Sequence, residues 1–248
     1  MKIAQLTDVG AKRQTNQDQV GVFNNQDQLQ LLVLCDGMGG HNAGDVASEM
    51  ALFHIGHAWE QTEAMTDSQF VMDWMVDMIS QANTRVYEKG QQYLGLQGMG
   101  TTLIAVVVLD GQALIAHVGD SRVYQIKNRL IEQVTKDHSF VQELVDSQVI
   151  TEEEAQTHPQ RNIVTRAIGT DQTVNIETQI LPLELEDVLL ICSDGLTDMI
   201  PATEAIEVFN QATTLEEAAE ALISAANASG GKDNISVILA QIEGSDIG

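Results

Sequence analysis

Four aspartates in this chain share a sequence environment that suits metal chemistry. Each stands where an apolar run meets glycine or a small polar residue: Asp36, Asp120, Asp194 and Asp233. Such runs predict buried strands, so we expect each carboxylate at a strand end or turn, half withdrawn from water. Buried carboxylates without partners are costly, and several in one place require cations to neutralise them. Because oxygen ligands suit hard ions, the pattern predicts Mg²⁺ or Mn²⁺.

The alternative is that these aspartates belong to four unrelated turns. A single Asp-Gly pair after a strand is an ordinary turn signal, since both residues tolerate turn conformations. A turn, however, does not need an apolar run beside the same acid each time. The joint pattern therefore favours one metal centre, provided that the fold brings the four aspartates together.

Six short motifs contain these aspartates, precede them or lie between them in the chain. In order they are Arg13-Gln-Thr-Asn-Gln-Asp18, Asp36-Gly-Met-Gly-Gly-His41, Gly100-Thr-Thr102, Gly119-Asp-Ser-Arg122, Ser193-Asp-Gly-Leu-Thr-Asp198 and Asp233-Asn-Ile-Ser236. Their order and spacing resemble the signature motifs of the metal-dependent Ser/Thr protein phosphatases, the PPM or type-2C family, and in particular its compact bacterial branch. The resemblance runs from the first predicted strand to the last.

The resemblance implies a set of metal ligands. The family position that matches Asp36 bridges two metals, the one that matches Gly37 gives a backbone carbonyl, and those that match Asp194 and Asp233 complete the pair. Bacterial relatives use the residue that matches Asp120, together with Asp194, for a third and weaker ion. We therefore expect two tightly bound Mg²⁺ or Mn²⁺ ions and a third weaker one, with a metal-activated water attacking phosphorus in line.

Three further catalytic residues are expected. Arg13 matches the family position that binds the phosphate, for which guanidinium offers a bidentate fork. Asp18 is expected to orient water from the second shell of the metals. Many eukaryotic relatives carry a histidine acid where this chain has Met38, so His41 is the nearest candidate for the general acid, although it could equally cap or pack a helix. The other histidines considered show no metal-type spacing: His117, His138 and His158.

The sequence disfavours two functions that compete with the phosphatase. Nucleotide binding is disfavoured because Asn42 occupies the third glycine position of a dinucleotide pattern, and no lysine follows Gly100 as a phosphate-binding loop requires. The other is a non-catalytic phosphoprotein-binding regulator on the same fold. It is disfavoured because every expected ligand position is present in this chain.

Composition narrows the class of protein. The 248 residues are 44% hydrophobic, and only three prolines and no linker-like tract occur, so we expect a single domain over residues 1–248. With 12 basic against 36 acidic residues the net charge is −24, which disfavours nucleic-acid and anionic membrane partners. Two cysteines and no membrane-spanning run predict a cytoplasmic protein. We also expect a monomer. Its expected partners are proteins phosphorylated by Ser/Thr kinases.

The periodicity of the chain predicts an α+β fold. Strands are expected at residues 2–8, 19–23, 29–35, 101–109, 112–118, 121–127, 130–134, 174–181, 187–192 and 234–241. Helices are expected at residues 44–59, 68–88, 138–147, 151–156, 203–209 and 215–228, with Asp67 as an N-cap. The family resemblance sharpens this to a four-layer α/β/β/α sandwich of two antiparallel sheets. It also implies a flap over residues 149–170, where Arg161 or Arg166 could touch a phosphopeptide or pair with a nearby acid.

Overall fold

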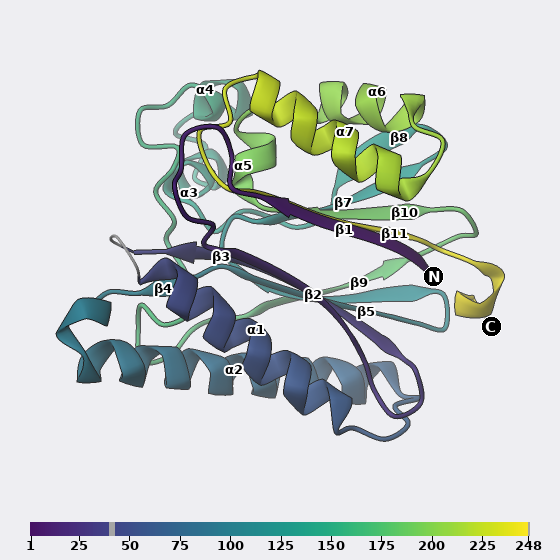
Figure 1. Cartoon of the computed structure of the whole chain (residues 1–248), viewed down its shortest axis with the longest axis horizontal. Coiled ribbons are helices and arrows are strands. Elements are labelled where there is room, and N and C mark those ends of the chain that lie inside the picture. Colours follow the sequence, from purple (N-terminus) through teal and green to yellow (C-terminus); the bar gives the residue numbers. More distant parts are fainter. Residues whose placement is uncertain (40–42, 248) are drawn as a thin grey trace.

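The structure is a computed structural model that describes residues 1–39 and 43–247. Two antiparallel sheets lie face to face, and helices cover the outer face of each (Figure 1). This arrangement confirms the predicted α/β/β/α sandwich. No helix among the described residues is both long and apolar enough to span a lipid bilayer.

The first sheet has the strand order β1-β11-β10-β7-β8. Its strands are β1 Lys2–Asp8, β7 Arg122–Lys127, β8 Leu130–Gln133, β10 Val188–Cys192 and β11 Ile235–Gln241. The second sheet has the order β2-β3-β5-β6-β9, and β4 pairs with β3 beside it. Its strands are β2 Asp18–Asn24, β3 Gln30–Met38, β4 Gly100–Thr101, β5 Leu103–Leu109, β6 Gln112–Val118 and β9 Glu177–Pro182.

The long helices form the two outer layers, and the short helices lie in the connections between strands (Figure 1). The helices α1 and α2 cover the second sheet, and α6 and α7 cover the first (Figure 1). The α-helices are α1 Gly44–Glu60, α2 Ser68–Gln92, α3 Phe140–Asp146, α4 Glu152–Gln156, α5 Asp194–Thr197, α6 Ala202–Gln211 and α7 Leu215–Ala228. Single 3₁₀ turns are η1 Leu94–Leu96 and η2 Gly244–Asp246. The predicted cap of α2 is present, because the Phe70 N–H donates to Asp67 Oδ1 at 2.7 Å.

The alternation of side chains along buried strands explains the four layers. On β3, Leu32 and Leu34 pack between the two sheets, whereas Leu31 and Val33 pack against α1 and α2. Strands with apolar side chains on both faces must be covered on both faces. Each sheet therefore has one apolar interface with the other sheet and one with its helices.

Two predicted element boundaries were wrong near the candidate site. The strand predicted to end at residue 35 continues to Met38, because Gly37 pairs with Thr101 of β4. Asp36 therefore lies inside β3 rather than at its end. The predicted turn at Asp194 is instead the first residue of the short helix α5. Four residues are too few to produce a readable helical period, so this helix could not be predicted from periodicity.

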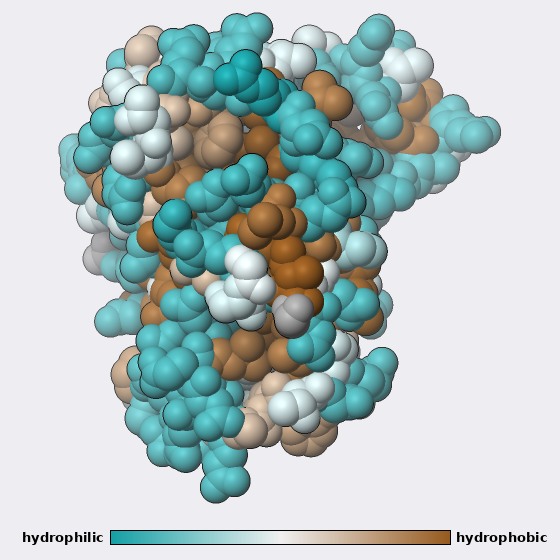
Figure 2. Space-filling view, turned by 90° about the vertical axis from the view of Figure 1, so that its right-hand side faces the viewer, coloured by the Kyte–Doolittle hydropathy of each residue, from teal (hydrophilic) through white to brown (hydrophobic). Residues whose placement is uncertain are grey.

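The two ends of the sandwich differ. The end of β3 and the helix α5 lie at the left of Figure 1, and both chain termini lie toward the opposite end. Figure 2 views the terminal end and shows hydrophobic residues gathered in the middle of this face, with hydrophilic residues around them. Asp36, near the end of β3, and Asp194, in α5, thus belong to the end of the sandwich away from the termini (Figure 1).

Candidate active site

Strand pairing brings two of the predicted site residues together. Asp18 is the first residue of β2 and lies opposite Asp36 in the register of β2 and β3. The Ser193 hydroxyl donates to Asp18 Oδ2 at 2.8 Å, and the Asp18 side chain is only 2% exposed. Its other oxygen, Oδ1, is buried without a hydrogen-bond partner among the described residues. One buried acceptor oxygen of Asp18 is therefore left unsatisfied by the described residues.

The backbone of Asp36 is fixed by two threonines. The Asp36 N–H donates to Thr102 Oγ1 at 3.0 Å, and the Thr101 hydroxyl donates to the Asp36 carbonyl at 2.9 Å. The Thr102 N–H donates to the same carbonyl at 2.8 Å. These three bonds limit how the Asp36 backbone can rotate, so they also set the direction of its carboxylate. The Gly100-Thr-Thr102 motif therefore acts as a positioning element.

Gly37 lies where the end of β3 meets the start of α1. A Cβ atom at this position would lie 2.2 Å from the carbonyl oxygen of Gly44 and 2.6 Å from that of Gln17. The Gly37 N–H donates to the Gln17 carbonyl at 3.1 Å. Only a residue without a side chain allows this approach of three backbone segments. The role of the Gly37 carbonyl as a metal ligand stays a prediction.

Two loops meet at the start of α5. A Cβ atom on Gly195, the residue after Asp194, would lie 1.8 Å from the Asn234 carbonyl oxygen. The absence of a side chain at Gly195 therefore lets the segment containing Asp233 pack directly against Asp194. Asn234 also accepts a hydrogen bond from the Gln17 N–H at 2.8 Å, so it joins the loop before β2 to the same point.

Asn234 and Asp233 together hold the loop that carries Arg13. The Asn234 side-chain amide donates to the carbonyls of Val9 and Thr15, each at 2.9 Å. Arg13 Nη2 lies 2.7 Å from Asp233 Oδ2, and half of the Arg13 side chain is exposed. Arg13 is therefore placed at the rim of the site, where part of its guanidinium remains accessible.

The carboxylates act on one another electrostatically. Burial raises the pKa of Asp18 to about 6 and that of Asp120 to about 7. Burial is also the largest cause that holds the pKa of Asp36 and of Asp194 well above the ordinary range, and neighbouring carboxylates raise both further. The neighbours that raise the pKa of Asp36 are Asp18, Asp194, Asp120 and Asp233.

The predicted aspartates therefore converge, which the sequence alone did not establish. Their charge must be neutralised by protons or by cations, because so many close carboxylates cannot all stay ionised in a buried site. The donors are carboxylate oxygens, and one of them, Asp18 Oδ1, has no partner among the described residues. This donor set fits hard divalent cations.

Asp120 is not paired with the nearby arginine. Arg122 binds Asp137 instead, with its Nη2 2.6 Å from Asp137 Oδ2 and its Nε donating to both carboxylate oxygens. Within residues 1–39 and 43–247, Asp120 makes no ion pair, and it is 8% exposed. Arg122 therefore does not neutralise Asp120 through an ion pair.

Arg161, in the segment 149–170 expected to form a flap, reaches an acid beside the cluster. Arg161 Nη2 is 3.7 Å from Asp198 Oδ2, so of the two alternatives for Arg161 the structure has the pairing with an acid. Asp198 in turn raises the pKa of both Asp194 and Asp120. His41, the expected general acid, lies outside the described residues.

Sequence reasoning gave no role to Ser193, Asn234 or Asp198, although the motifs quoted for the resemblance include all three. Ser193 and Asn234 each directly adjoin a predicted ligand, which was the available signal. What each side chain binds depends on segments far away in the chain, and spacing alone does not reveal that.

A second group of possible metal ligands includes His117, which lies three residues before Asp120. His117, His138 and Glu177 each offer an atom within 4.8 Å of the others. The histidine spacing did not predict this, because the pair comes from different elements. The two rings are stacked, with centroids 4.7 Å apart and planes 12° apart. An ion in the plane of one stacked ring lies well out of the plane of the other, so this conformation does not offer both rings to one ion.

Hydrogen bonds and burial account for this histidine pair without a metal. The Gly119 N–H donates to His138 Nδ1 at 3.0 Å, and His138 Nε2 lies 3.1 Å from Glu177 Oε2. Burial lowers the pKa of both histidines, that of His117 to about 4, so both rings are neutral at neutral pH. The aspartate cluster therefore remains the candidate metal centre.

Comparisons with known proteins agree with this centre. The sequence pattern of the family Protein phosphatase 2C matches residues 10–239. Serine/threonine phosphatase Stp of Listeria monocytogenes serotype 4b is 43% identical over 235 residues, which cover 95% of this chain and 93% of that protein. Among solved structures, serine/threonine phosphatase Stp1 from Staphylococcus aureus has a TM-score of 0.94 and 42% identity, covering 98% of this chain and 95% of that one.

A further solved structure contains metal. The catalytic domain of the serine/threonine protein phosphatase PstP, in complex with two manganese ions, has a TM-score of 0.85 and 32% identity, and covers 98% of each chain. The match of the family pattern over most of the sequence, together with these full-length relatives, shows that the chain belongs to the protein phosphatase 2C family.

Proposed function

We propose that this protein is a metal-dependent phosphatase that hydrolyses phosphoserine and phosphothreonine in proteins. The observation that carries the proposal is the convergence of five carboxylates at one end of the sandwich beside Arg13, where burial and neighbouring carboxylates raise the pKa of Asp36 and Asp194. The relatives support it, since Stp and Stp1 are named serine/threonine phosphatases.

The metals would be held by the carboxylates of the cluster. We assign two tightly bound Mg²⁺ or Mn²⁺ ions to Asp36, Asp194, Asp233 and the Gly37 carbonyl, and a third weaker ion to Asp120 with Asp194. The two manganese ions of the PstP complex support this number for the tight pair. When bound, such ions neutralise the phosphate and lower the pKa of the water that attacks phosphorus.

The chain's own residues bind and orient the reactants. Arg13 offers two parallel N–H groups to the phosphate, and its contact with Asp233 keeps the guanidinium at the rim of the cluster. Asp18, held by the Ser193 hydroxyl, would orient metal-bound water by accepting a hydrogen bond at its unsatisfied oxygen Oδ1. The leaving alkoxide needs a proton, for which His41 remains our candidate.

The test is phosphate release from a phosphothreonine peptide in Mn²⁺ and in excess EDTA. We expect multiple turnovers in Mn²⁺ and none above background in EDTA, with activity restored when Mn²⁺ is returned. The competing function, a non-catalytic regulator, predicts peptide binding without release in either buffer. Equal release in EDTA and Mn²⁺ would contradict the metal requirement.

We also propose that the protein acts in the cytoplasm as a single-domain monomer on proteins phosphorylated by Ser/Thr kinases, without nucleic-acid or membrane partners. The net charge of −24 supports the absence of anionic partners of those kinds. The two cysteines, Cys35 and Cys192, are free and buried, which supports a reducing compartment. Light scattering on the purified chain tests the oligomeric state, with the mass of one chain expected.

A further inference from the structure

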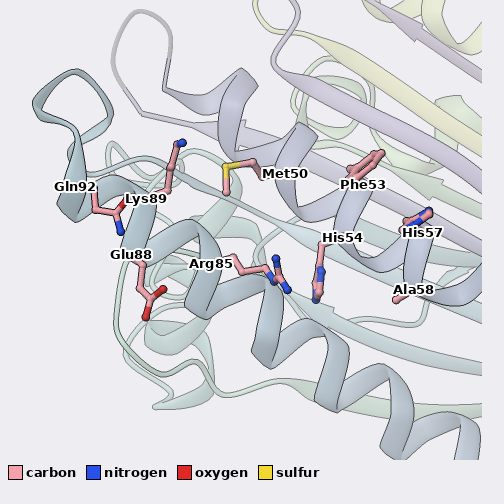
Figure 3. Close-up of a pocket in the computed structure, with 9 residues that line it drawn as sticks. All are labelled: Met50, Phe53, His54, His57, Ala58, Arg85, Glu88, Lys89 and Gln92. Carbon is pink, nitrogen blue, oxygen red and sulfur yellow. The ribbon is translucent and has the colours of Figure 1, made fainter.

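A groove of about 610 Å³ lies between α1 and α2 on the outer, helical side of the second sheet. Residues from both helices line it: Met50, Phe53, His54, His57 and Ala58 from α1, and Arg85, Glu88, Lys89 and Gln92 from α2. Figure 3 shows these side chains, with Arg85 and His54 pointing toward one another from the two helices. None of them belongs to the aspartate cluster.

The groove is basic, although the whole chain is strongly acidic. Arg85 and Lys89 both line it, and neither forms an ion pair in the part of the chain that the structure describes. Glu88 is the one acid in the lining. In a chain with 36 acidic and 12 basic residues, two cations without carboxylate partners in one groove form a local positive site.

A histidine between the helices adds a hydrogen-bonding group. His54 Nε2 is buried and has no hydrogen-bond partner within the described residues. Burial, and next the charge of Arg85, lower the pKa of His54, so the ring is neutral near pH 7. It therefore offers a hydrogen bond beside the guanidinium rather than a third positive charge. An oxyanion in the groove could be bound by both groups.

The same groove has an aromatic wall. Phe53 is 68% exposed and stacks on His57, with ring centroids 5.6 Å apart and planes 8° apart. At the α2 side, the Lys89 ammonium lies 4.5 Å from the ring centroid of Tyr93, which is itself 51% exposed. Exposed aromatic rings beside cations without acidic partners suit a ligand that carries both an apolar group and negative charge.

We propose that this groove docks an acidic peptide segment of the phosphoprotein substrate, in which carboxylates flank a hydrophobic side chain. Arg85, Lys89 and His54 bind the carboxylates, and the hydrophobic side chain packs on Phe53. As a substrate-docking site the inference rests on the proposed phosphatase function. Binding of the peptide itself does not depend on catalysis.

The size of the groove favours a short peptide. The α1 residues that line it run from Met50 to Ala58, a length of about 12 Å at 1.5 Å per residue, which matches three to four extended residues. Charge favours an acidic one. A phosphoprotein approaches a chain of net charge −24 against long-range repulsion, and a basic groove on its surface offsets that repulsion locally.

The first experiment measures binding alone. The probe is a fluorescein-labelled peptide with the sequence Asp-Glu-Phe-Asp-Glu, followed by fluorescence anisotropy in EDTA at low and moderate salt. A matched Asn-Gln-Phe-Asn-Gln peptide tests the charge. We expect saturable binding of the acidic peptide that weakens with salt, and at least tenfold weaker binding of the neutral peptide.

Three substitutions locate the binding. Arg85→Glu or Lys89→Glu should weaken binding of the acidic peptide at least tenfold. Phe53→Ser should weaken it several-fold, and it perturbs the fold little because the ring is exposed. The matched control is Arg129→Glu, an equal charge change at an exposed arginine in the turn between β7 and β8, which should change affinity less than twofold. If Arg85→Glu and Arg129→Glu lose the same affinity for the acidic peptide, the effect comes from net charge alone and the proposal is wrong.

The second experiment tests docking during turnover. Phosphothreonine peptides carry the acidic segment through Gly-Ser linkers of increasing length, so that one linker can span both sites. At the best length we expect a KM at least fivefold lower than without the segment, and Arg85→Glu should abolish this gain. Turnover of p-nitrophenyl phosphate should stay the same in wild type, Arg85→Glu and Arg129→Glu.

The outcomes separate the two proposals. If Arg85→Glu abolishes peptide binding but the wild type releases no phosphate, the groove binds the peptide and the proposed phosphatase function is wrong. Normal phosphate release with no effect of the acidic segment at any linker length contradicts substrate docking. A wild-type dimer in sedimentation that Arg85→Glu dissociates would assign the groove to a second copy of this chain and overturn the proposal.

Discussion

Asp18 and Asp36 lie opposite each other on β2 and β3, and Asp120, Asp194 and Asp233 reach the same place from three other segments. A folded protein tolerates such a cluster when something neutralises it. Two features restrict how these carboxylates can move: the threonine bonds to the Asp36 backbone and the Ser193 bond to Asp18. The cluster is therefore positioned before any ion binds, which is what a metal site needs.

Arg13 should contribute mainly to binding of the phosphate. Replacing it with alanine removes a charge-assisted pair of hydrogen bonds, worth about 1.5–3 kcal/mol, so we expect KM for a phosphopeptide to rise roughly tenfold or more. Arg13→Lys should recover only part, because an ammonium lacks the planar fork. Steady-state kinetics with p-nitrophenyl phosphate and a phosphopeptide measures both changes. Unaltered KM and kcat in both variants would make Arg13 an ordinary surface residue.

Asp120 should affect only the weak metal. Its carboxylate makes no ion pair among the described residues, so it is available for an ion that otherwise binds mostly water. We expect Asp120→Ala to keep the tight metal pair, to lose much of its activity on phosphopeptides, and to regain part of it in millimolar Mn²⁺. Titration calorimetry counts the weak sites in the two proteins. The same count, with unchanged phosphopeptide turnover, would contradict the assignment.

At the residue scale, the sequence predicted the acids better than the groups that hold them. Asp36, Asp120, Asp194 and Asp233 were found because each carries the same local pattern. Ser193 was not assigned because its partner, Asp18, lies 175 residues away in the chain. The local spacing of residues predicts the structure of their own segment. It does not predict a contact with a segment that is distant in the chain.

The meeting of β3 with α1 depends on Gly37, and its replacement tests that element contact. A Cβ atom there would meet the Gly44 carbonyl oxygen at 2.2 Å, so backbone must move in Gly37→Ala. We expect a destabilisation of about 1–3 kcal/mol, as in other overpacked sites, together with loss of most activity. Denaturant unfolding and phosphopeptide turnover measure the two effects.

The matched control for this substitution is Gly95→Ala. A Cβ atom on Gly95 would have nothing within 4 Å, so stability should change by less than about 0.5 kcal/mol and activity should stay at the wild-type level. Gly37→Ala behaving like Gly95→Ala would mean that the strand and the helix are not in the close contact described.

At the element scale, long periodic segments were predictable and short ones were not. The ranges of α1, α2 and α7 agree closely with their apolar periods, and Asp67 caps α2 as expected. The helix α5 has four residues and β4 has two, both too short for a period to be read. The two elements form because of contacts with β3 and β11, and both lie at the candidate site.

At the scale of the whole molecule, apolar packing between the two sheets, and between each sheet and its helices, stabilises the sandwich. The buried aspartate cluster limits that stability. Raised carboxyl pKa values mean that the folded state holds protons that the unfolded state releases. For Asp18 and Asp120 the stabilisation by bound protons is complete below about pH 4 and is lost as pH rises through about 6 and about 7. Without metal, the folded state should therefore become less stable between pH 4 and pH 7.5.

Divalent cations should reverse this loss. At 100 times the dissociation constant, a ligand that binds only the folded state adds about 2.7 kcal/mol, which corresponds to a rise in Tm of roughly 5–10 °C for a chain of this size. Calorimetry from pH 5 to pH 7.5 in EDTA and in Mn²⁺ measures the effect. We expect a larger Mn²⁺ shift at pH 7.5 than at pH 5. A shift that is absent, or larger at pH 5, would contradict a carboxylate metal centre.

The most direct test of the metal centre is Asp194→Asn. The substitution keeps the shape of the side chain and removes the charge that would bind metal, and it relieves repulsion within the cluster. In saturating Mn²⁺ we predict loss of most phosphothreonine-peptide hydrolysis, while in EDTA the variant should be at least as stable as the wild type. Near-wild-type turnover of a folded Asp194→Asn protein would contradict metal-dependent catalysis at this cluster.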